Sequence, residues 1–455
     1  MTKKLYIQTY GCQMNQYDSE RIVQVMGRAG YRPTDRIDAA DLILLNSCSV
    51  RDKAEQKVYS ALGAWKEFKE YRKGVIIGVG GCVAQQEGEN LLKRIPHLDL
   101  VFGTHNIHKL PEMVALVESA RARPVQTAFY RDPAYMEDEG GRTRVQGVKA
   151  FVTIMQGCNK VCSFCIVPHV RGRELSRPSG KIIAEIESLA AQGIIEVMLL
   201  GQNVNSYGKL TPGEISFAEL LARVDGVRRI ERIRFTTSHP QDLSPELIEA
   251  FATLDHLCEH LHLPVQSGSD SVLARMRRGY TRAEYLRRID RLRRHCPGVA
   301  LSTDIIVGFP GESDAEFCST LELLEQVGYD EIFSFMYSPR PQTVSAKIFD
   351  DDVPEAVKKE RLARVQQLQQ KISLAKNRQR IGGVVEVLVE GPSKLGNGQM
   401  MGRTRDNRIV NFSGDNRGAG RLAPVRITGA TANSLLGELL CDKLTMNSPL
   451  EGDMA

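Results

Sequence analysis

The chain has 455 residues, of which 42% are hydrophobic and 25% are charged, and its formal net charge is +5. This composition excludes a mainly disordered chain, and the length predicts about three domains at roughly 150 residues each. No run reaches the ~18 apolar residues of a membrane helix, and the N-terminal sequence lacks an apolar leader segment. We therefore expect a cytoplasmic protein without membrane contact, whose ten cysteines stay reduced rather than forming disulfides.

The N-terminal region alternates short apolar strands with amphipathic helices. Strands are expected at residues 5–10, 41–47 and 74–80, because each segment is short, apolar and rich in branched side chains. The alternation predicts a doubly wound α/β domain over residues 1–118. Residues 119–146 are polar and contain several Pro and Gly residues, which predicts a linker.

A second series of strands and helices covers residues 147–377. Its six strand candidates are 150–155, 196–200, 232–237, 259–265, 301–307 and 332–338. Helical stretches follow the first five, and a long helix is expected at 354–380. A closed (βα) barrel needs eight such units, so we expect a partial (βα)6 barrel.

The C-terminal region changes character. Residues 378–442 contain short strands separated by glycine turns, a pattern typical of a small all-β barrel. Between Lys376 and Arg426 the basic residues exceed the acidic ones by six, which is more than the +5 of the whole chain. The positive charge is therefore concentrated here. Residues 443–455 are expected to be a flexible tail.

One group of cysteines is local in the sequence. Cys158, Cys162 and Cys165 have C-x3-C-x2-C spacing directly after the first strand of the barrel-like region. Barrels of this kind hold their chemistry at the carboxyl ends of the strands, where these thiols are expected. Three thiolates leave one iron of a [4Fe–4S] cluster open to another ligand. The alternative is a zinc knuckle completed by a distant residue such as His169, but no second ligand pair lies nearby.

A second group is dispersed. Cys12, Cys48 and Cys82 each follow one of the three strands predicted in the first domain. The carboxyl ends of parallel strands meet at one edge of a sheet, with ~4.8 Å between neighbours, so these thiols are predicted to lie together. The alternative is three independent buried thiols; the adjoining glycines and polar residues favour a second three-cysteine cluster. The other cysteines are expected to be packing residues: Cys258, Cys296, Cys318 and Cys441.

The local cysteine motif, on the first loop of a six-unit barrel, resembles the radical S-adenosylmethionine (SAM) superfamily. The resemblance implies that the open iron binds SAM and that an electron passed through the cluster releases a 5′-deoxyadenosyl radical. It also implies that polar loops after the other strands surround SAM. The residues implied at this cofactor site are Gln202, Asn203, Ser238, Gln266, Asp304, Gly308 and Glu312. Asp304 lies within a strand, where a structural role is an equal alternative.

The order of the three regions resembles the methylthiotransferase family over residues 3–442. The resemblance implies two [4Fe–4S] clusters with all six grouped cysteines as catalytic ligands: one cluster generates the radical, and the auxiliary cluster offers sulfur. One SAM methylates that sulfur, a second provides the radical, and a methylthio group replaces a substrate hydrogen. A flavodoxin- or ferredoxin-type electron donor and a sulfur- or cluster-supply protein are implied as partners.

Several segments, including 159–178 and 276–285, are most similar to family members that modify carbon 2 of N6-isopentenyl-adenosine next to the tRNA anticodon. Gln342 departs from this pattern, because glycine is more usual there. Three alternatives stay open. Other family members modify threonylcarbamoyl-adenosine in tRNA or an aspartate of a ribosomal protein, and a non-enzymatic iron–sulfur protein would bind RNA or sense redox state.

Residues 378–442 also resemble the TRAM domain, an OB-like RNA-binding module, which implies contact with the tRNA anticodon stem-loop. The residues expected to bind phosphates are Lys394, Arg403, Arg405 and Arg408. Such contacts supply position more than sequence recognition. The alternative is an ordinary solvated basic surface. We expect a monomer.

Overall fold

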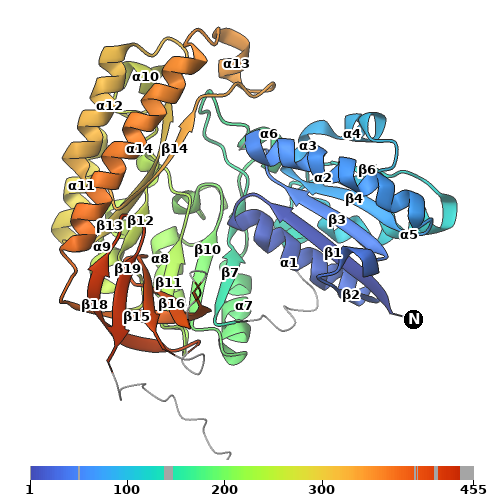
Figure 1. Ribbon diagram of the computed structural model, residues 1–455, viewed down its shortest axis with the longest axis horizontal. Helices are drawn as coiled ribbons and strands as arrows, with labels where there is room; N and C mark the ends of the chain where they lie inside the picture. Colours follow the sequence, from blue (N-terminus) through green and yellow to red (C-terminus); the bar gives the residue numbers. More distant parts are fainter. Residues whose placement is uncertain are drawn as a thin grey trace, which may run out of the picture.

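The computed structural model describes residues 2–49, 52–137, 147–393, 396, 398–414 and 419–440. It contains an N-terminal α/β domain, a second region with parallel strands, and a C-terminal β-barrel beneath that region (Figure 1). The tail predicted at 443–455 lies outside the described residues. None of the helices described is long and apolar enough to cross a membrane.

The first domain is built on a six-stranded parallel sheet with the order β2-β1-β3-β4-β5-β6. The three predicted strands are neighbours within it: β1 (Lys3–Tyr10), β3 (Leu42–Ser47) and β4 (Ile76–Gly81). Every residue of β3 and β4 is buried, as expected for a sheet with helices on both faces. The other strands are short: β2 (Tyr31–Pro33), β5 (Leu100–Phe102) and β6 (Val125–Gln126). The helices are α1 (Gln13–Arg28), α2 (Asp52–Tyr71), α3 (Cys82–Glu87), α4 (Glu89–Arg94) and α5 (Leu110–Ala120).

Residues 119–146, predicted to be a linker, belong to the first domain where the structure describes them. Strand β6 pairs in parallel with β5, and a short 3-10 turn buries the side chains of Tyr135 and Met136. The linker prediction is therefore wrong for these elements, because a two-residue strand is too short to give a periodic signal. Residues 138–146 lie outside the described part of the chain.

The second region contains all six predicted strands. They are β7 (Lys149–Thr153), β10 (Glu196–Leu200), β11 (Arg232–Phe235), β12 (His260–His262), β13 (Ala300–Val307) and β14 (Glu331–Met336). They form two sheets, β11-β10-β7 and β12-β13-β14, which a bridge between Ile233 and Leu257 joins. Strands β7 and β14 are the two ends of this arc, so the barrel is partial, as predicted.

Helices cover the outside of the barrel. They are α7 (Ser179–Ala191), α8 (Phe217–Asp225), α9 (Pro245–Thr253), α10 (Asp270–Arg275), α11 (Arg282–His295), α12 (Asp314–Val327) and α14 (Glu355–Arg378). Shorter elements lie in the loops: β8 (Met155–Gln156), α6 (Val167–Arg171), β9 (Leu175–Ser176) and α13 (Val344–Ile348). Alternate strand residues, such as Val197 and Leu199, are fully buried in the core that these helices share with the strands. The side chains between them face the barrel interior.

The terminal barrel is closed, with the order β15-β16-β17-β19-β18. Its strands are β15 (Val384–Pro392), β16 (Gln399–Thr404), β17 (Ile409–Ser413), β18 (Leu422–Ala430) and β19 (Leu435–Leu439). Arg234 of β11 donates hydrogen bonds to the carbonyls of Thr404 (2.7 Å) and Arg405 (2.9 Å). Lys149, at the start of β7, forms an ion pair with Glu390. The terminal barrel therefore covers the amino ends of the larger barrel's strands.

Candidate active site

The dispersed cysteines come together because three strands end at the same level. The register pairs Tyr10 of β1 with Ser47 of β3, and Ser47 with Gly81 of β4. Cys12, Cys48 and Cys82 follow those ends directly or one residue later. We call these three residues the auxiliary triad. It lies at one edge of the sheet, although its members are far apart in the sequence.

Within the auxiliary triad, Cys48 contacts both other thiols. Its hydrogen bond is the largest influence that lowers the pKa of Cys12, to about 6, and of Cys82, to about 7. The same contacts raise the pKa of Cys48 well above its usual value. The Arg171 guanidinium also lowers the pKa of Cys12 and Cys82. Two of the three thiols therefore ionise easily, and the thiolate is the form that binds iron.

Glycine permits this close approach. Gly11 has φ +142°, and a Cβ atom there would lie 2.5 Å from the Cβ of Cys48 and 2.6 Å from Oδ1 of Asn15. Any larger residue would push the end of β1 away from Cys48. The backbone conformation is also one that residues with a Cβ rarely adopt.

The local cysteines occupy the loop between β8 and α6. We call Cys158, Cys162 and Cys165 the loop triad. Arg278 Nη1 donates to Cys162 Sγ at 3.2 Å, and the Lys160 amide donates to Cys158 Sγ at 3.4 Å. Burial raises the pKa of Cys158 to about 11 and that of Cys165 to about 12. In contrast to the auxiliary triad, these two thiols are neutral at pH 7 without a bound metal.

Both triads fit a four-iron cluster better than a single metal ion. Among the described residues, no three His, Cys, Asp or Glu side chains surround a position suited to one ion. A zinc knuckle at His169 would require four such ligands around one ion, so the structure gives it no support. A [4Fe–4S] cluster uses one thiolate for each iron it ligates. Three thiols would therefore ligate three irons of such a cluster and leave the fourth open.

Two helices bring the triads toward each other. Helix α1 begins directly after Cys12, and its Met14 and Tyr17 pack against Leu200 of the barrel. Helix α6 follows the loop triad, and its Val170 clusters with Ile166 and Cys82. Figure 1 shows α6 beside α3, between the two domains. A five-residue helix is only about 7.5 Å long, so α6 connects the surroundings of both triads over a short distance.

The predicted SAM residues other than Asp304 lie after strands β10, β11, β12 and β13, at the carboxyl end of the barrel, and Asp304 lies within β13. Gln202 accepts a hydrogen bond from the Gly157 amide, beside the loop triad, and Asn203 donates to Asp242 at 2.8 Å. Four of the predicted residues have a buried polar atom without a protein partner: Gln202 Nε2, Asn203 Oδ1, Ser238 Oγ and Glu312 Oε1. Because such atoms are costly to leave unpaired, this end of the barrel fits a polar ligand.

The remaining predicted SAM residues shape the backbone or face the interior. Gln266 has φ +78°, and its amide donates to the Asp304 carbonyl at 2.9 Å. The Asp304 carboxylate lies 3.6 Å from Nε2 of His262, so it has a structural partner. The Gly308 amide donates to Oε2 of Glu312 at 2.6 Å, which fixes the turn after β13.

Sequence reasoning missed three side chains at the same end of the barrel. Gln156 Nε2, Glu174 Oε1 and His239 Nε2 are also buried without a partner. Burial raises the pKa of Glu174 and lowers that of His239 to about 2, so the imidazole is neutral. His239 directly follows Ser238, one of the residues predicted at the SAM site. Neither Gln156 nor Glu174 carries a motif that would have distinguished it.

The predicted phosphate-binding arginines are engaged between domains. Arg405 pairs with Glu259 at 2.8 Å and donates to the Leu257 carbonyl at 2.8 Å. Arg408 pairs with Asp330, which precedes β14. The prediction that these two side chains are available for phosphates is therefore wrong, since they hold the terminal barrel in place. Arg403 contacts Asn407 and Glu390 within the terminal barrel, and Lys394 lies outside the described residues.

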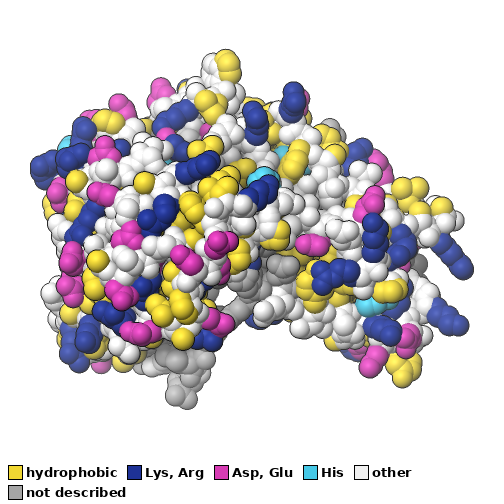
Figure 2. Space-filling model, turned by 90° about the horizontal axis from the view of Figure 1, so that it is seen from above, with side chains coloured by type: hydrophobic (Ala, Val, Ile, Leu, Met, Phe, Trp, Pro, Cys, Tyr) yellow, Lys and Arg dark blue, Asp and Glu magenta, His cyan; other side chains and the backbone are white. Residues whose placement is uncertain are grey.

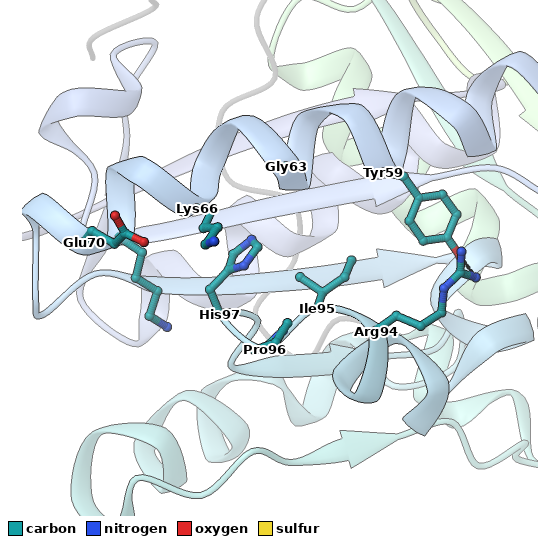
Figure 3. Close-up of a pocket in the computed structure, with 9 residues that line it drawn as sticks. Tyr59, Gly63, Lys66, Glu70, Arg94, Ile95, Pro96 and His97 are labelled. Carbon is teal, nitrogen blue, oxygen red and sulfur yellow. Dashed lines mark hydrogen bonds between the residues drawn. The ribbon is translucent and has the colours of Figure 1, made fainter.

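The pocket in Figure 3 lies away from both triads, in the first domain. Tyr59, Gly63, Lys66 and Glu70 of α2 line one side, and residues 94–97 line the other. Arg94 donates to the Tyr59 hydroxyl at 2.8 Å. The pocket contains none of the predicted site residues, so it adds nothing to the candidate site.

The remaining ungrouped cysteines are only partly as predicted. Cys258 and Cys296 are buried packing residues, whereas Cys318 is exposed, so the prediction is wrong for it. Cys441 lies outside the described residues. The exposed thiol of Cys318 belongs to neither triad.

Comparisons with known proteins identify the family. Three family profiles match: the uncharacterized protein family UPF0004 at 4–103, the radical SAM superfamily at 152–324 and the TRAM domain at 378–440. A tRNA-2-methylthio-N(6)-dimethylallyladenosine synthase from Geobacter metallireducens is 55% identical over 96% of this chain and 98% of its own. The synthase from Geobacter sulfurreducens is 53% identical over 97% of this chain and 98% of its own. The synthase from Myxococcus xanthus is 51% identical over 96% of this chain and 94% of its own. The chain belongs to this synthase family.

Solved structures agree on the fold. The radical SAM methyltransferase TsrM from Kitasatospora setae, with tryptophan and a SAM analogue bound, matches 76% of this chain and 75% of its own with a TM-score of 0.57. The same enzyme with cobalamin and a [4Fe–4S] cluster gives a TM-score of 0.56, over 76% of this chain and 77% of its own. Sequence identity is 15% and 14%, so the likeness concerns the fold alone. It confirms the predicted radical-SAM architecture.

Proposed function

We propose that this chain is a radical-SAM enzyme that methylthiolates carbon 2 of N6-isopentenyl-adenosine next to the anticodon of tRNA. The observation that carries the proposal is that the surroundings of the two three-thiol sites, on separate domains, pack together: Ile166, directly after Cys165, clusters with Cys82. The names of the relatives favour this substrate over threonylcarbamoyl-adenosine and a ribosomal-protein aspartate. A non-enzymatic sensor would not need unpartnered polar atoms around a second ligand site.

The cofactors are two [4Fe–4S] clusters and SAM. When bound, they supply a 5′-deoxyadenosyl radical and a methylated sulfur for insertion. In our proposal the loop triad holds the cluster that binds SAM, and the auxiliary triad holds the other. Gln202, Ser238 and Glu312 orient SAM through their unpartnered buried atoms. Asn203 and Gln266 complete the wall of that site.

The residues between the triads isolate the chemistry from water. Met14 and Tyr17 of α1 form one hydrophobic cluster with Leu200. Phe151 and Met198, in the barrel interior, pack against the same cluster. Because this contact covers the β7 side of the open barrel, bulk water is kept from the space toward which both triads face. Arg278 holds Cys162 and also donates to the Pro264 carbonyl at 2.7 Å, which fixes the loop triad against the barrel.

The target base must leave its stack to reach this end of the barrel. In a tRNA loop this displacement costs little, because the base is not held in a long duplex. Figure 2 shows hydrophobic side chains in the middle of the upper face, with Lys and Arg side chains among and around them. That mixture suits an isopentenyl group flanked by phosphates. We propose that the anticodon stem-loop approaches this face.

The other partners are proposed from the chemistry. Radical formation from SAM requires an external electron, for which we propose a flavodoxin- or ferredoxin-type donor. Repeated insertion consumes sulfur, for which we propose a sulfur- or cluster-supply protein. We further propose that the enzyme works as a monomer in the cytoplasm, where tRNA is modified. We also propose that the domains extend over residues 1–118, 147–377 and 378–442, with β6 added to the first.

Nucleoside mass spectrometry of tRNA from cells that lack this protein tests the proposed function. We expect 2-methylthio-N6-isopentenyl-adenosine to disappear and N6-isopentenyl-adenosine to accumulate. The wild-type chain should restore the product, and Cys12→Ala should not. Unchanged product in a strain without a paralogue would exclude this substrate. Loss of a methylthiolated threonylcarbamoyl-adenosine instead would assign the chain to the alternative tRNA reaction.

A further inference from the structure

Arg171 joins the two domains beside the auxiliary triad. It is the last residue of α6 and is almost fully buried, with 3% of its surface exposed. Its Nη2 donates to Oδ2 of Asp18 at 2.7 Å, and that carboxylate is equally buried. Asp18 belongs to α1, the helix that begins after Cys12. The ion pair therefore ties together the two helices that bring the triads toward each other.

The other terminal nitrogen of Arg171, Nη1, is fully buried and has no oxygen or nitrogen acceptor among the described residues. The group beside the guanidinium is a sulfur. Val170, the preceding residue of α6, clusters with Cys82, and a hydrogen bond from the Arg171 side chain contributes to the lowered pKa of Cys82. The end of α6 is also held rigidly. Thr104 Oγ1 donates to the Val170 carbonyl at 2.7 Å, and Nε2 of His105 bonds the Arg171 carbonyl at 2.9 Å.

A second buried arginine in the same segment provides a contrast. Arg177 is also 3% exposed, but each of its nitrogens has an acceptor. Nε and Nη2 donate to the Glu137 carboxylate at 2.9 and 3.1 Å, and Nη1 donates to Glu185 at 2.8 Å. Arg177 shows that the fold can satisfy a buried guanidinium completely. Other structural arginines, Arg232 and Arg361, leave a buried Nε without a partner, so Arg171 is distinguished by the thiols beside its guanidinium rather than by the unpaired nitrogen alone.

We propose that Arg171 is a positioning residue of the auxiliary site, whose Nη1 donates a hydrogen bond to a sulfur atom of the cluster on Cys12, Cys48 and Cys82. This inference rests on the proposed function, which places a [4Fe–4S] cluster there. Such a cluster presents sulfur acceptors to the buried donor beside Cys82. Asp18 fixes the plane of the guanidinium so that Nη1 stays directed at the cluster. A cluster carries more negative charge in its reduced state. A hydrogen bond to one of its sulfur atoms, or a positive charge nearby, therefore stabilises the reduced state and raises the reduction potential.

The test is an EPR-monitored redox titration of the full-length holoenzyme, performed with and without SAM to separate the two clusters. SAM alters the signal of the cluster that binds it, and the other signal reports the auxiliary site. Arg171→Met should shift the auxiliary potential to a more negative value and leave that of the SAM-responsive cluster unchanged. Arg171→Lys keeps the charge and should give a smaller shift in the same direction. Arg177→Met is the matched control, which should lower thermal stability without moving either potential.

Two results would overturn the proposal. The first is that the reduction potential of the auxiliary cluster is unchanged in both Arg171→Lys and Arg171→Met. The second is that the reduction potentials of both clusters shift equally. If Arg171→Met does not retain the auxiliary cluster, the titration of Arg171→Lys decides. A more negative auxiliary potential in that variant supports the proposal, and an unchanged one contradicts it. Cys48→Ala separates this inference from the proposed function. If the SAM-insensitive signal persists in Cys48→Ala, the assignment of the cluster to the auxiliary triad is wrong, independently of Arg171.

Discussion

The two triads provide the same number of thiols by opposite routes. The loop triad comes from one short segment, Cys158 to Cys165, and its geometry is local. The auxiliary triad comes from the ends of three strands, and its members lie far apart in the sequence. A small change of register in β1, β3 or β4 would separate the auxiliary thiols but leave the loop triad intact. The geometry of the loop triad therefore depends on one loop, whereas that of the auxiliary triad depends on the whole sheet.

The electrostatic environments differ in the same way. In the auxiliary triad, mutual hydrogen bonds and Arg171 lower the pKa of Cys12 and Cys82. In the loop triad, burial raises the pKa of Cys158 and Cys165. The fold itself thus favours the thiolate form of two auxiliary thiols, Cys12 and Cys82, while the pKa of Cys48 is raised. At the loop site, the thiols would have to lose their protons when a cluster binds.

The largest expected effect comes from removing a loop-triad ligand. Cys158→Ala should abolish reductive cleavage of SAM, because two remaining thiols do not hold the cluster. Chromatographic quantification of 5′-deoxyadenosine measures the loss, and Cys318→Ala, which changes an exposed cysteine outside both triads, is the control. Cleavage at more than a few per cent of the wild-type rate would show that another residue completes this site.

A substitution beside the auxiliary triad should separate the two sites. Gly11→Ala places a methyl group against Cys48, in a backbone conformation that costs about 1–3 kcal/mol for a residue with a Cβ. We expect tRNA methylthiolation to fall at least ~10-fold while SAM cleavage stays near the wild-type rate. Gly180→Ala is the matched control, since nothing lies within 4 Å of its Cβ. Equal loss of both activities would mean that the auxiliary triad does not act separately.

A smaller effect is expected at Arg278, which supports the loop triad alone. Arg278→Met removes the bonds to Cys162, Pro264 and Tyr280. Leaving buried acceptors unpaired should lower the free energy of unfolding by about 1–3 kcal/mol and weaken the SAM-binding cluster. Chemical denaturation and the SAM-responsive EPR signal measure both effects. Selective loss of the SAM-insensitive signal would contradict this assignment.

The smallest effect concerns the terminal barrel. Arg408 is occupied by Asp330, so Arg408→Ala should leave the salt dependence of tRNA binding unchanged. Loss of one phosphate contact would instead reduce the slope of log K against log salt by about 0.9. Titration of tRNA at several salt concentrations measures the slope. Arg421→Ala, at an exposed position of the same barrel, is the comparison and should reduce the slope if this surface contacts the phosphates.

Sequence reasoning succeeded where local patterns carry the information. Buried parallel strands are visible as apolar runs, and the position of Cys12, Cys48 and Cys82 after such runs is enough to predict that they share one sheet edge. It failed where partners are distant. Arg408 and Asp330 are 78 positions apart, and no local pattern shows that one neutralises the other. The place of the Arg171 guanidinium beside the auxiliary thiols could not be predicted for the same reason, because its surroundings come from both domains.

The division of labour between the triads is the central claim, and Cys12→Ala tests it most directly. The purified, reconstituted variant should be incubated with reductant, SAM and isopentenylated tRNA, and both products should be quantified. We predict that 5′-deoxyadenosine still forms and that no 2-methylthio-N6-isopentenyl-adenosine does. If SAM cleavage is lost together with methylthiolation, or if methylthiolation persists, the auxiliary triad does not have the role assigned to it.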